Sequence, residues 1–391
     1  MNLDAWRNEL ADIMPHIIEL RRSLHRCPEL SGCEEATSRR MVEEMKALGY
    51  SIRLYKGSYA VMAEMRNGDG PCVGIRADMD ALPIVEKSDL PFRSVRDGVM
   101  HACGHDVHMS LAVGSATWFA AHRDRWHGTL KYFFEPSEET IGGGKQMVEE
   151  GCLENPKVDV VIGQHVNPRY APGTFFAKPG YVSGASDELE LTVRGCRSHG
   201  AYPEGGVDAI VIAAQIITAV QTLVSRTISP FQSAVITIGT IEGGTANNII
   251  SGEVRMTGTI RTLNEKTRSL LHSELHRTCE GIAAAMGGSC EVTITPSYGA
   301  VYNDDAAYAV IEDAAAEIVG REKIVVREAP SLGVDSFCYY VQDTPGVYYD
   351  IGSGISTALH TDTFLVDESC MLPGVAMQIA SALGLGLAKE A

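Results

Sequence analysis

Residues 187–195, DELELTVRG, alternate polar and apolar side chains, as a half-buried β-strand does. The segments that follow are a long apolar helix (208–226), two strands (233–241 and 252–263), a second long helix (264–287) and a final strand (290–298). This β-α-β-β-α-β order is that of a ferredoxin-like unit and predicts one contiguous domain of about 110 residues.

On both sides of this unit, strands alternate with helices. The expected strands include CVGIRADM (72–79), GTLKYFFEP (128–136), VDVVIGQHV (158–166) and GVYYDIGSG (346–354), and the expected helices lie at 34–50, 110–122 and 305–320. Such alternation predicts a doubly wound α/β fold. We therefore expect a mixed-sheet catalytic domain built from residues 1–185 and 298–391. A smaller ferredoxin-like α+β lid domain (186–297) interrupts it.

The composition limits the classes of partner. The formal net charge of −17 argues against nucleic acids and anionic membranes, which would repel the chain. The sequence has neither a signal-peptide pattern at its start nor an uninterrupted apolar run of about 18 residues, the length that spans a membrane. The ten cysteines include no CxxC pair, a usage typical of reduced thiols. We expect a cytoplasmic protein that acts on small molecules.

MHACGHDVHM (100–109) concentrates possible metal ligands. Cys103 and His105 are separated by one glycine, and a sharp loop between a strand and a helix could aim both at one ion. The alternative is a loop whose histidines cap the next helix. His108 falls within that helix, which favours a supporting or packing role, and His101 is intermediate.

Two other stretches carry paired carboxylates. In GIRADMDALPIVE (74–86), Asp78 and Asp80 lie on one side of a strand, and Asp80 could orient a metal-bound histidine through its second nitrogen. In FFEPSEETIGGG (133–144), one carboxylate of Glu138 and Glu139 could ligate a metal while the other acts as general base. The alternatives are a turn and a charged loop with solvated carboxylates.

His165 and His360 each stand alone beside an apolar strand, a position also typical of a core or loop histidine. The possible ligands taken together are Cys103, His105, Glu139, His165 and His360. Five donors suffice for two ions if one ligand bridges. Mixed sulfur, nitrogen and oxygen donors suit Zn, Mn, Co or Ni rather than Mg or Ca.

The order of motifs along nearly the whole chain resembles one family. The motifs are LRRSLHRCPELSGCEEAT, GIRADMDALPIVE, MHACGHDVHM, FEPSEE, GQHV, SHGAYPEGGVDAIVIAAQ, GGTANNIISGEVRMTGTIRTL and LHTDTF. The chain is similar to the metal-dependent amidohydrolases that include hippurate hydrolase, N-acyl-amino-acid amidohydrolase (aminoacylase) and the plant indole-acetyl-amino-acid hydrolases. These enzymes are related to two-zinc aminoacylases and carboxypeptidases.

The resemblance implies cleavage of N-acyl amino acids to a carboxylate and a free amino acid, with two divalent ions, Zn or Mn first and Co or Ni next. The implied ligands are Cys103 as the bridge, His105, Glu139, His165 and His360. Glu138 would be the general base and Asp80 would orient a ligand. On the lid, His199 would stabilise the oxyanion, and Asn248 and Arg261 would grip the substrate carboxylate. Relatives are commonly homodimers joined through the lid, and in some of them the lid histidine serves the partner's site.

The chain departs from the family pattern at Glu204, where a histidine is usual after proline, at Ser251, where proline is usual, and in GVDSF (333–337), where Glu-Asp-Phe is usual. None of these positions is an implied ligand, but they bear on substrate preference. Other interpretations are a dipeptidase or carboxypeptidase with the same metals, a binding protein that has lost catalysis, and redox use of Cys103. The full ligand set with Glu138 disfavours the second, and the lack of a nearby resolving cysteine disfavours the third.

Overall fold

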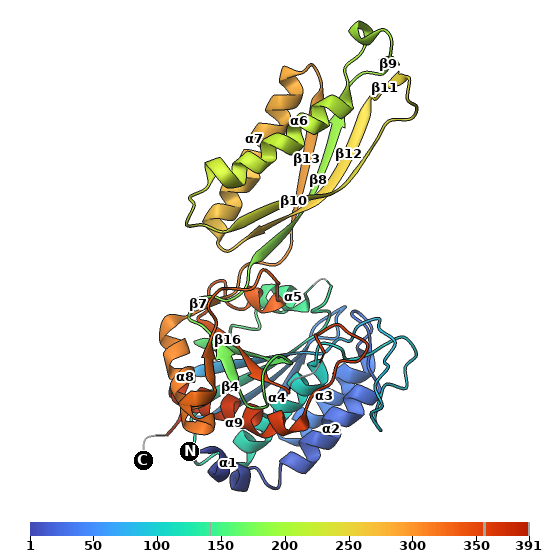
Figure 1. Cartoon of the computed structure of the whole chain (residues 1–391). Coiled ribbons are helices and arrows are strands. Elements are labelled where there is room, and N and C mark those ends of the chain that lie inside the picture. The colour runs from blue at the N-terminus through green and yellow to red at the C-terminus, as the bar shows by residue number, and fades with distance from the viewer. Residues whose placement is uncertain (141, 355–356, 390–391) are drawn as a thin grey trace. The chain divides into compact units, whose positions relative to one another are not determined.

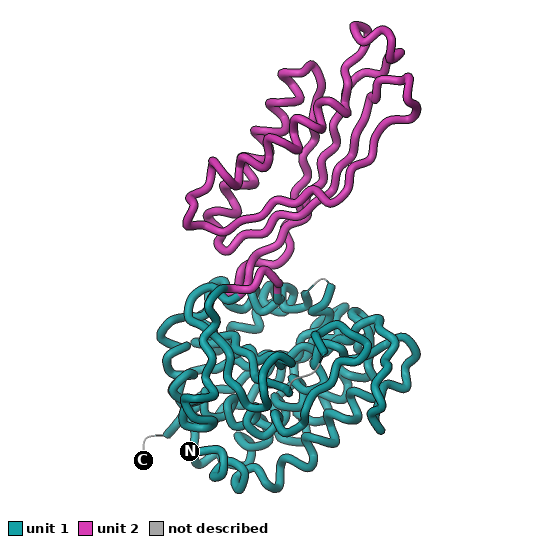
Figure 2. The backbone as a smooth tube through the Cα atoms, viewed as in Figure 1, with its two compact units in different colours: residues 1–182, 302–329, 335–391 teal, residues 183–301, 330–334 magenta. Residues whose placement is uncertain are grey.

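An eight-stranded sheet forms the centre of the first of two units in the computed structural model (Figure 1). The structure describes residues 1–140, 142–354 and 357–389. The first unit comprises Met1–Val182, Tyr302–Ala329 and Asp335–Ala391, and the second comprises Ser183–Val301 and Pro330–Val334 (Figure 2). The second unit thus extends a few residues beyond the predicted 186–297, and it includes a short return segment that the sequence does not predict.

The strands of the large sheet lie in the order β1-β2-β4-β3-β5-β16-β6-β15. Their bounds are β1 Ser51–Leu54, β2 Val61–Asn67, β3 Cys72–Asp78, β4 Gly128–Glu135, β5 Val160–Asn167, β6 Phe175–Ala177, β15 Ile324–Val326 and β16 Gly346–Gly352. The four central strands, β4, β3, β5 and β16, are parallel, whereas β1 and β2 pair antiparallel. The predicted mixed sheet is confirmed.

Helices cover this sheet. They are α1 Leu3–Glu9, α2 Met14–Arg26, α3 Glu35–Ala47, α4 His105–Ala121, α5 Gly143–Glu149, α8 Asp305–Val319 and α9 Met371–Ala382. Every residue of β3 and β4 is buried. Neighbouring side chains of β4 face different layers: Tyr132 belongs to the main core with α4, while Phe133 stacks on Tyr340, with 5.4 Å between ring centroids. Burial on both faces explains why these strands are apolar runs without alternation.

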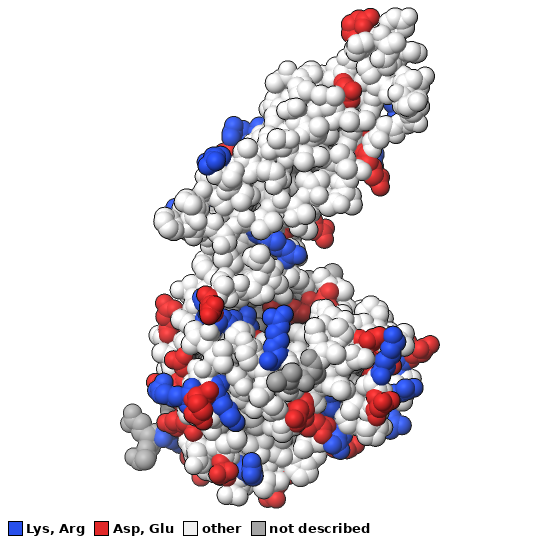
Figure 3. Space-filling model, viewed as in Figure 1, with Lys and Arg blue, Asp and Glu red and all other residues white. Residues whose placement is uncertain are grey.

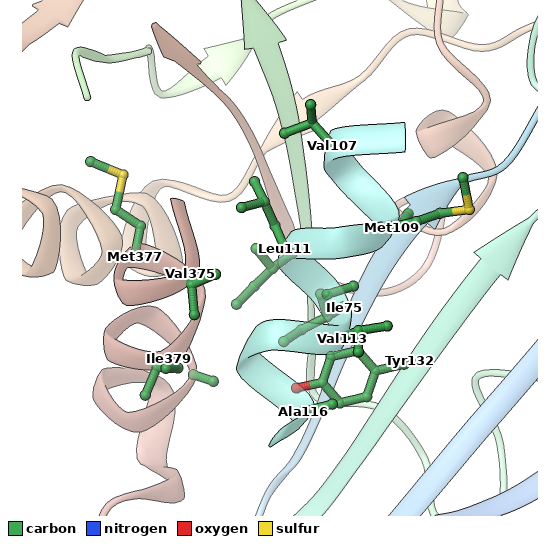
Figure 4. Close-up of a cluster of buried hydrophobic side chains, with 14 of the residues drawn as sticks. Ile75, Val107, Met109, Leu111, Val113, Ala116, Tyr132, Val375, Met377 and Ile379 are labelled. Carbon is green, nitrogen blue, oxygen red and sulfur yellow. The ribbon is translucent and has the colours of Figure 1, made fainter. Parts of the chain in front are cut away.

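Helix α4 lies in the middle of the core, where it packs against α2. Figure 4 shows it between α9 and the strands of the sheet. Nearly all of its residues are buried, so it is apolar around its whole circumference. Its small residues allow close approach: a Cβ on Gly114 would lie 2.7 Å from Cγ2 of Val375 on α9. This packing fixes the first turn of α4, which begins at His105, relative to the sheet.

The second unit has a four-stranded sheet in the order β10-β12-β8-β13, with two helices. Its elements are β8 Ala185–Arg194, α6 Ala209–Thr222, β10 Ala234–Gly243, β12 Glu253–Thr262, α7 Glu265–Ala285 and β13 Ser289–Pro296. The alternation of β8 buries Leu189, Leu191 and Val193 in a core of their own with both helices. Side chains cap the two helices, Asp208 at α6 and Asn264 at α7.

Two helical segments in the described part of the chain, Ala209–Thr227 and Glu368–Leu387, are long and apolar enough to cross a membrane by length and composition, each with a mean hydropathy of 1.6. Both supply buried side chains to the cores, such as Ile216 in the first and Val375 in the second. Core helices meet the same criterion, so it assigns no membrane span here.

Candidate metal centre and active site

The candidate site lies at the carboxyl ends of parallel strands β3, β4 and β5, beside the first turn of α4. These strands end at Asp78, Glu135 and Asn167, so the loops that follow them leave the sheet at one edge. That edge is where doubly wound proteins bind their ligands. The loops after β3 and β4, the end of β5 and the segment after β16 bring together polar side chains that are far apart in the sequence.

The loop before α4 depends on Gly104. Its φ is +88°, in the left-handed region that glycine adopts without steric cost. A Cβ at this position would lie 2.3 Å from Cγ2 of Val166 on β5. Glycine therefore lets the loop pass directly against β5, with Cys103 just before it and His105 as the first residue of α4.

Cys103 lies at the centre of a cluster of possible ligands. Its Sγ is 3.4 Å from Nε2 of His165 and 3.4 Å from Nε2 of His360. Nε2 of His360 is 3.1 Å from Oε1 of Glu139, and the same oxygen is 3.9 Å from Nε2 of His105. The structure therefore brings together, within the first unit, all five residues that the sequence suggests as ligands.

The cluster fits a pair of ions. Cys103 with His105 and His165 forms one group, and Cys103 with Glu139 and His360 forms another; in each, the ligand atoms lie within 4.8 Å of one another. The shared thiol is placed as a bridge would be. Nε2 of His105 is buried without a hydrogen-bond partner among the described residues, which is costly unless a ligand satisfies it.

The imidazoles of two possible ligands are held through their other nitrogen. Nδ1 of His105 donates to the backbone carbonyl of Asp80 at 2.8 Å, and Nδ1 of His165 donates to that of Val166 at 2.7 Å. Both rings therefore turn Nε2 toward the cluster. Such outer hydrogen bonds fix the tautomer and orientation of metal-binding histidines.

Protonation of the cluster makes metal binding depend on pH. Burial raises the pKa of the Cys103 thiol well above its usual value, although His105 opposes this rise. Burial disfavours a charge on His105, but Asp78 and Cys103 outweigh it and raise the pKa of the imidazole well above its usual value. A metal ion bound by these residues would have to displace these protons, so its affinity would fall as the pH falls.

Glu138 and Glu139 are adjacent in sequence but differ in environment. Burial, followed by the charge of Asp335, raises the pKa of Glu138 well above the usual carboxyl value. Burial also opposes ionisation of Glu139, but its hydrogen bond with His360 and the charge of His105 lower the pKa of this carboxyl. Pairs of carboxyl groups with pKa values driven apart divide acid–base work from charge-binding work. Glu138 thus suits proton transfer, and Glu139 suits ligation.

Asp80 holds the turn that presents these two glutamates. Its Oδ1 accepts the backbone N–H of Glu138 and its Oδ2 that of Glu139, each at 3.0 Å, and the hydroxyl of Ser31 donates to Oδ2 at 2.6 Å. From the sequence, this carboxylate is expected to orient a histidine. In the structure, Oδ1 of Asp80 is 3.4 Å from Nδ1 of His105, whereas the backbone carbonyl oxygen of Asp80 is 2.8 Å from the same nitrogen.

Arg76 and Glu34 support the site, and neither is among the site residues predicted from the sequence. The buried guanidinium of Arg76 pairs with Asp78 at 2.5 Å and with Glu135 at 2.8 Å. The carboxylate of Glu34 accepts the backbone N–H of Ser137 at 2.7 Å, which fixes a residue with a φ of +59° just before Glu138. A charge within the apolar run CVGIRADM is a usable signal for Arg76, because a buried charge requires partners. Glu34 offers no such signal.

The three lid residues lie in the second unit. His199 is opposite Ile249 where β9 (Ser198–His199) pairs with β11 (Ile249–Ile250), and the carbonyl of Asn248 accepts the N–H of Gly200 at 2.8 Å. Arg261 is opposite Ser186, at the other end of β12. At about 3.4 Å per residue, the length of β12 places it roughly 27 Å from this tip. The structure brings His199 and Asn248 together and leaves Arg261 apart.

Residues 74–383 match the model of peptidase family M20/M25/M40. The chain is 36% identical to N-acetyldiaminopimelate deacetylase of Leuconostoc mesenteroides, over 90% of this chain and 93% of the relative. It is 35% identical to thermostable carboxypeptidase 2 of Saccharolobus solfataricus, over 95% and 96%. Among solved structures, it resembles a dinuclear metal-binding M20 peptidase of Bacillus subtilis with a TM-score of 0.81 and 30% identity, covering 95% of this chain and 98% of that one.

Proposed function

The chain belongs to peptidase family M20/M25/M40 and is a metal-dependent amidohydrolase that cleaves N-acyl amino acids, and we propose that it does so with two ions held by Cys103, His105, Glu139, His165 and His360. The observation that carries the proposal is the position of Cys103 Sγ, 3.4 Å from each of two imidazoles, between the two ligand groups. Two divalent ions there would polarise the amide carbonyl and lower the pKa of a water molecule.

Glu138 is the proposed general base. The residue is 8% exposed, and the N–H of Ser336 donates to Oε1 at 3.2 Å. Burial raises the pKa of this carboxyl above its usual value and so increases its affinity for a proton, which suits a group that takes the proton from the attacking water and delivers it to the leaving amine. Asp80 and Glu34 keep this carboxyl in place through the backbone of the turn.

His199 is the proposed donor to the carbonyl oxygen as that oxygen gains negative charge. A donor that meets charge only in the tetrahedral state lowers the barrier instead of merely tightening substrate binding. The N–H of Ala201 donates to Nδ1 of His199 at 3.1 Å, which leaves Nε2 as the nitrogen that carries a proton. Asn248 and Arg261 are proposed to bind the carboxylate of the substrate.

A homodimer accounts for the distance between these lid residues. His199 and Asn248 lie roughly 27 Å from Arg261 along β12, by the rise of about 3.4 Å per residue. This is far longer than one N-acyl amino acid, so the lid of a single chain cannot bring both ends to one substrate. Two chains can do so, and we propose that His199, together with Asn248 beside it, acts on the substrate bound by the partner.

The surface of the second unit supports this assembly. Strand β10 lies at one edge of its sheet, and a sheet edge can pair with that of a second copy about a two-fold axis. Apolar side chains at the start of α6 and on β10 are exposed: Ile210 is 45% exposed, Val211 46% and Ile241 54%. The face of this unit seen in Figure 3 carries few Lys, Arg, Asp or Glu side chains.

Zn or Mn is the proposed metal, with Co or Ni as alternatives, because the ligand atoms are a mixture of sulfur, nitrogen and oxygen. We also propose a cytoplasmic location without nucleic-acid or membrane partners. None of the ten cysteines, all in the described part of the chain, forms a disulfide, as is usual in a reducing compartment.

A hydrolysis screen tests the function. The chelated enzyme is reconstituted separately with Zn, Mn, Co and Ni and assayed on N-acyl amino acids with varied acyl and amino parts, beside dipeptides and longer peptides. We expect release of free amino acid from the N-acyl series. The Glu138→Gln variant, purified in the same way, controls for a contaminating hydrolase. Cleavage of peptides alone would favour the carboxypeptidase or dipeptidase alternative.

A further inference from the structure

His108 lies one turn into α4, and its imidazole is buried between β3 and β5, at 2% exposure. Nδ1 is 2.6 Å from Oδ1 of Asp78 at the end of β3. Nε2 accepts the backbone N–H of Val166 on β5 at 3.0 Å. Both ring nitrogens therefore have protein partners, so His108 does not serve as a further metal ligand, although it lies close to His105 and Asp78.

The imidazole of His108 connects strands β3 and β5 where their backbone pairing ends. Strands β3 and β5 pair from Val73 with Val160 as far as Arg76 with Gly163. Beyond that point, the ring of His108 joins the two strand ends. Because a backbone N–H can only donate, Nε2 must be the acceptor and Nδ1 must carry the proton that it donates to Asp78.

Val166 connects this ring to a proposed metal ligand. Its N–H is held by His108, and its carbonyl accepts Nδ1–H of His165 at 2.7 Å. The ring centroids of His108 and His165 are 4.5 Å apart, so the two imidazoles also pack against each other. These contacts determine where Nε2 of His165 lies, 3.4 Å from Sγ of Cys103.

We propose that His108, anchored by Asp78, is a positioning residue that holds His165 in its ligating orientation. The inference rests on the proposed metal cluster. Its new claim is that the binding of one ion, the ion held by Cys103 and His165, depends on His108. The group formed by Cys103, Glu139 and His360 does not include His165 and is expected to keep its ion.

Metal titration of three variants tests this role. We expect His108→Ala to retain one tightly bound equivalent of Zn and to bind the second about 10 to 100 times more weakly, the usual effect of losing an outer partner of a metal ligand. His108→Gln restores part of that affinity, because its amide can accept from Val166 and donate to Asp78. The matched control is His101→Ala, which removes an equally buried imidazole without a hydrogen-bond partner among the described residues.

Two spectroscopic measurements complete the test. The visible spectrum of the cobalt form should change in His108→Ala and not in His101→Ala. In the metal-free wild-type protein, ¹⁵N NMR of labelled histidine should show His108 protonated at Nδ1, a result that needs no variant to fold. Wild-type affinity for both ions in His108→Ala, equal weakening of both ions, the same loss in His101→Ala, or a proton on Nε2 would each overturn the role. A wild-type protein that binds fewer than two ions would instead contradict the proposed metal cluster.

Discussion

Replacing Asp80 with Asn removes one of the two oxygens that hold the catalytic turn. Oδ1 and Oδ2 each accept one backbone N–H, from Glu138 and Glu139, at 3.0 Å. Whichever way the amide is oriented, its NH₂ group faces one of these donors and cannot accept from it. An unpaired buried donor costs about 1–3 kcal/mol, and the other hydrogen bond loses its charge. We expect the free energy of unfolding to fall by about 2–3 kcal/mol.

The activity of Asp80→Asn should fall more than its metal content. A displacement of about 1 Å at a catalytic group can lower a rate roughly 100-fold, so we expect a loss of kcat of that order. The backbone carbonyl that orients His105 is unchanged by the substitution, so both ions should remain.

The assay combines urea unfolding of the chelated proteins, kcat with a single N-acyl amino acid, and metal stoichiometry. Ser31→Ala is the control, because it removes a donor to Oδ2 and leaves both backbone hydrogen bonds in place; its kcat should stay near that of the wild type. Unchanged stability and kcat in Asp80→Asn would refute the proposal that the Asp80 carboxylate fixes the turn through its hydrogen bonds with Glu138 and Glu139. Loss of a metal ion with unchanged stability would show that the carboxylate acts on the histidine instead.

The Glu138→Gln variant should keep both ions and lose kcat by a factor on the order of 10² or more, whereas Glu139→Gln should lose metal. If metal analysis shows that Glu138→Gln loses metal and Glu139→Gln keeps it, the two roles are exchanged. A mixed dimer of one Glu138→Ala chain and one His199→Ala chain, purified through two tags, should regain one working site, and activity no higher than that of the parent mutants would exclude action in trans. Burial opposes ionisation of Glu86, but hydrogen bonds led by that of His25 lower the pKa of this carboxyl to about 2. The ionised Glu86 carboxylate therefore stabilises the fold fully above a pH of about 4.5, and this stabilisation is lost as the pH falls toward 2. The difference in unfolding free energy between wild type and Glu86→Gln should shrink over that interval. A difference that stays constant would contradict this assignment.

Local pattern was enough to predict the sheet and its layers, because buried parallel strands and amphipathic helices differ in period and length. Short strands were harder. Strands β1 and β6 hold only four and three residues, and β6 is added to the sheet by pairing with β15 and β16, contacts that no local pattern encodes.

The donor types in the candidate site were predictable from sequence, whereas the supports around them were not. Cys103 and His105 stand out by spacing alone. The contact of Glu34 with Ser137 joins residues 103 positions apart through a backbone N–H, and the contact of His108 with Val166 joins residues 58 positions apart in the same way. Backbone donors are the same at every position, so residue identity gives no indication of which of them a side chain will meet.

The most direct measurement of the central claim is the hydrolysis rate of the exhaustively chelated enzyme as defined equivalents of Zn or Mn are added. The ligand cluster predicts no activity without metal and a rise that levels off at two equivalents per chain. Full hydrolysis of N-acyl amino acids by enzyme that metal analysis shows to be empty would contradict the metal mechanism.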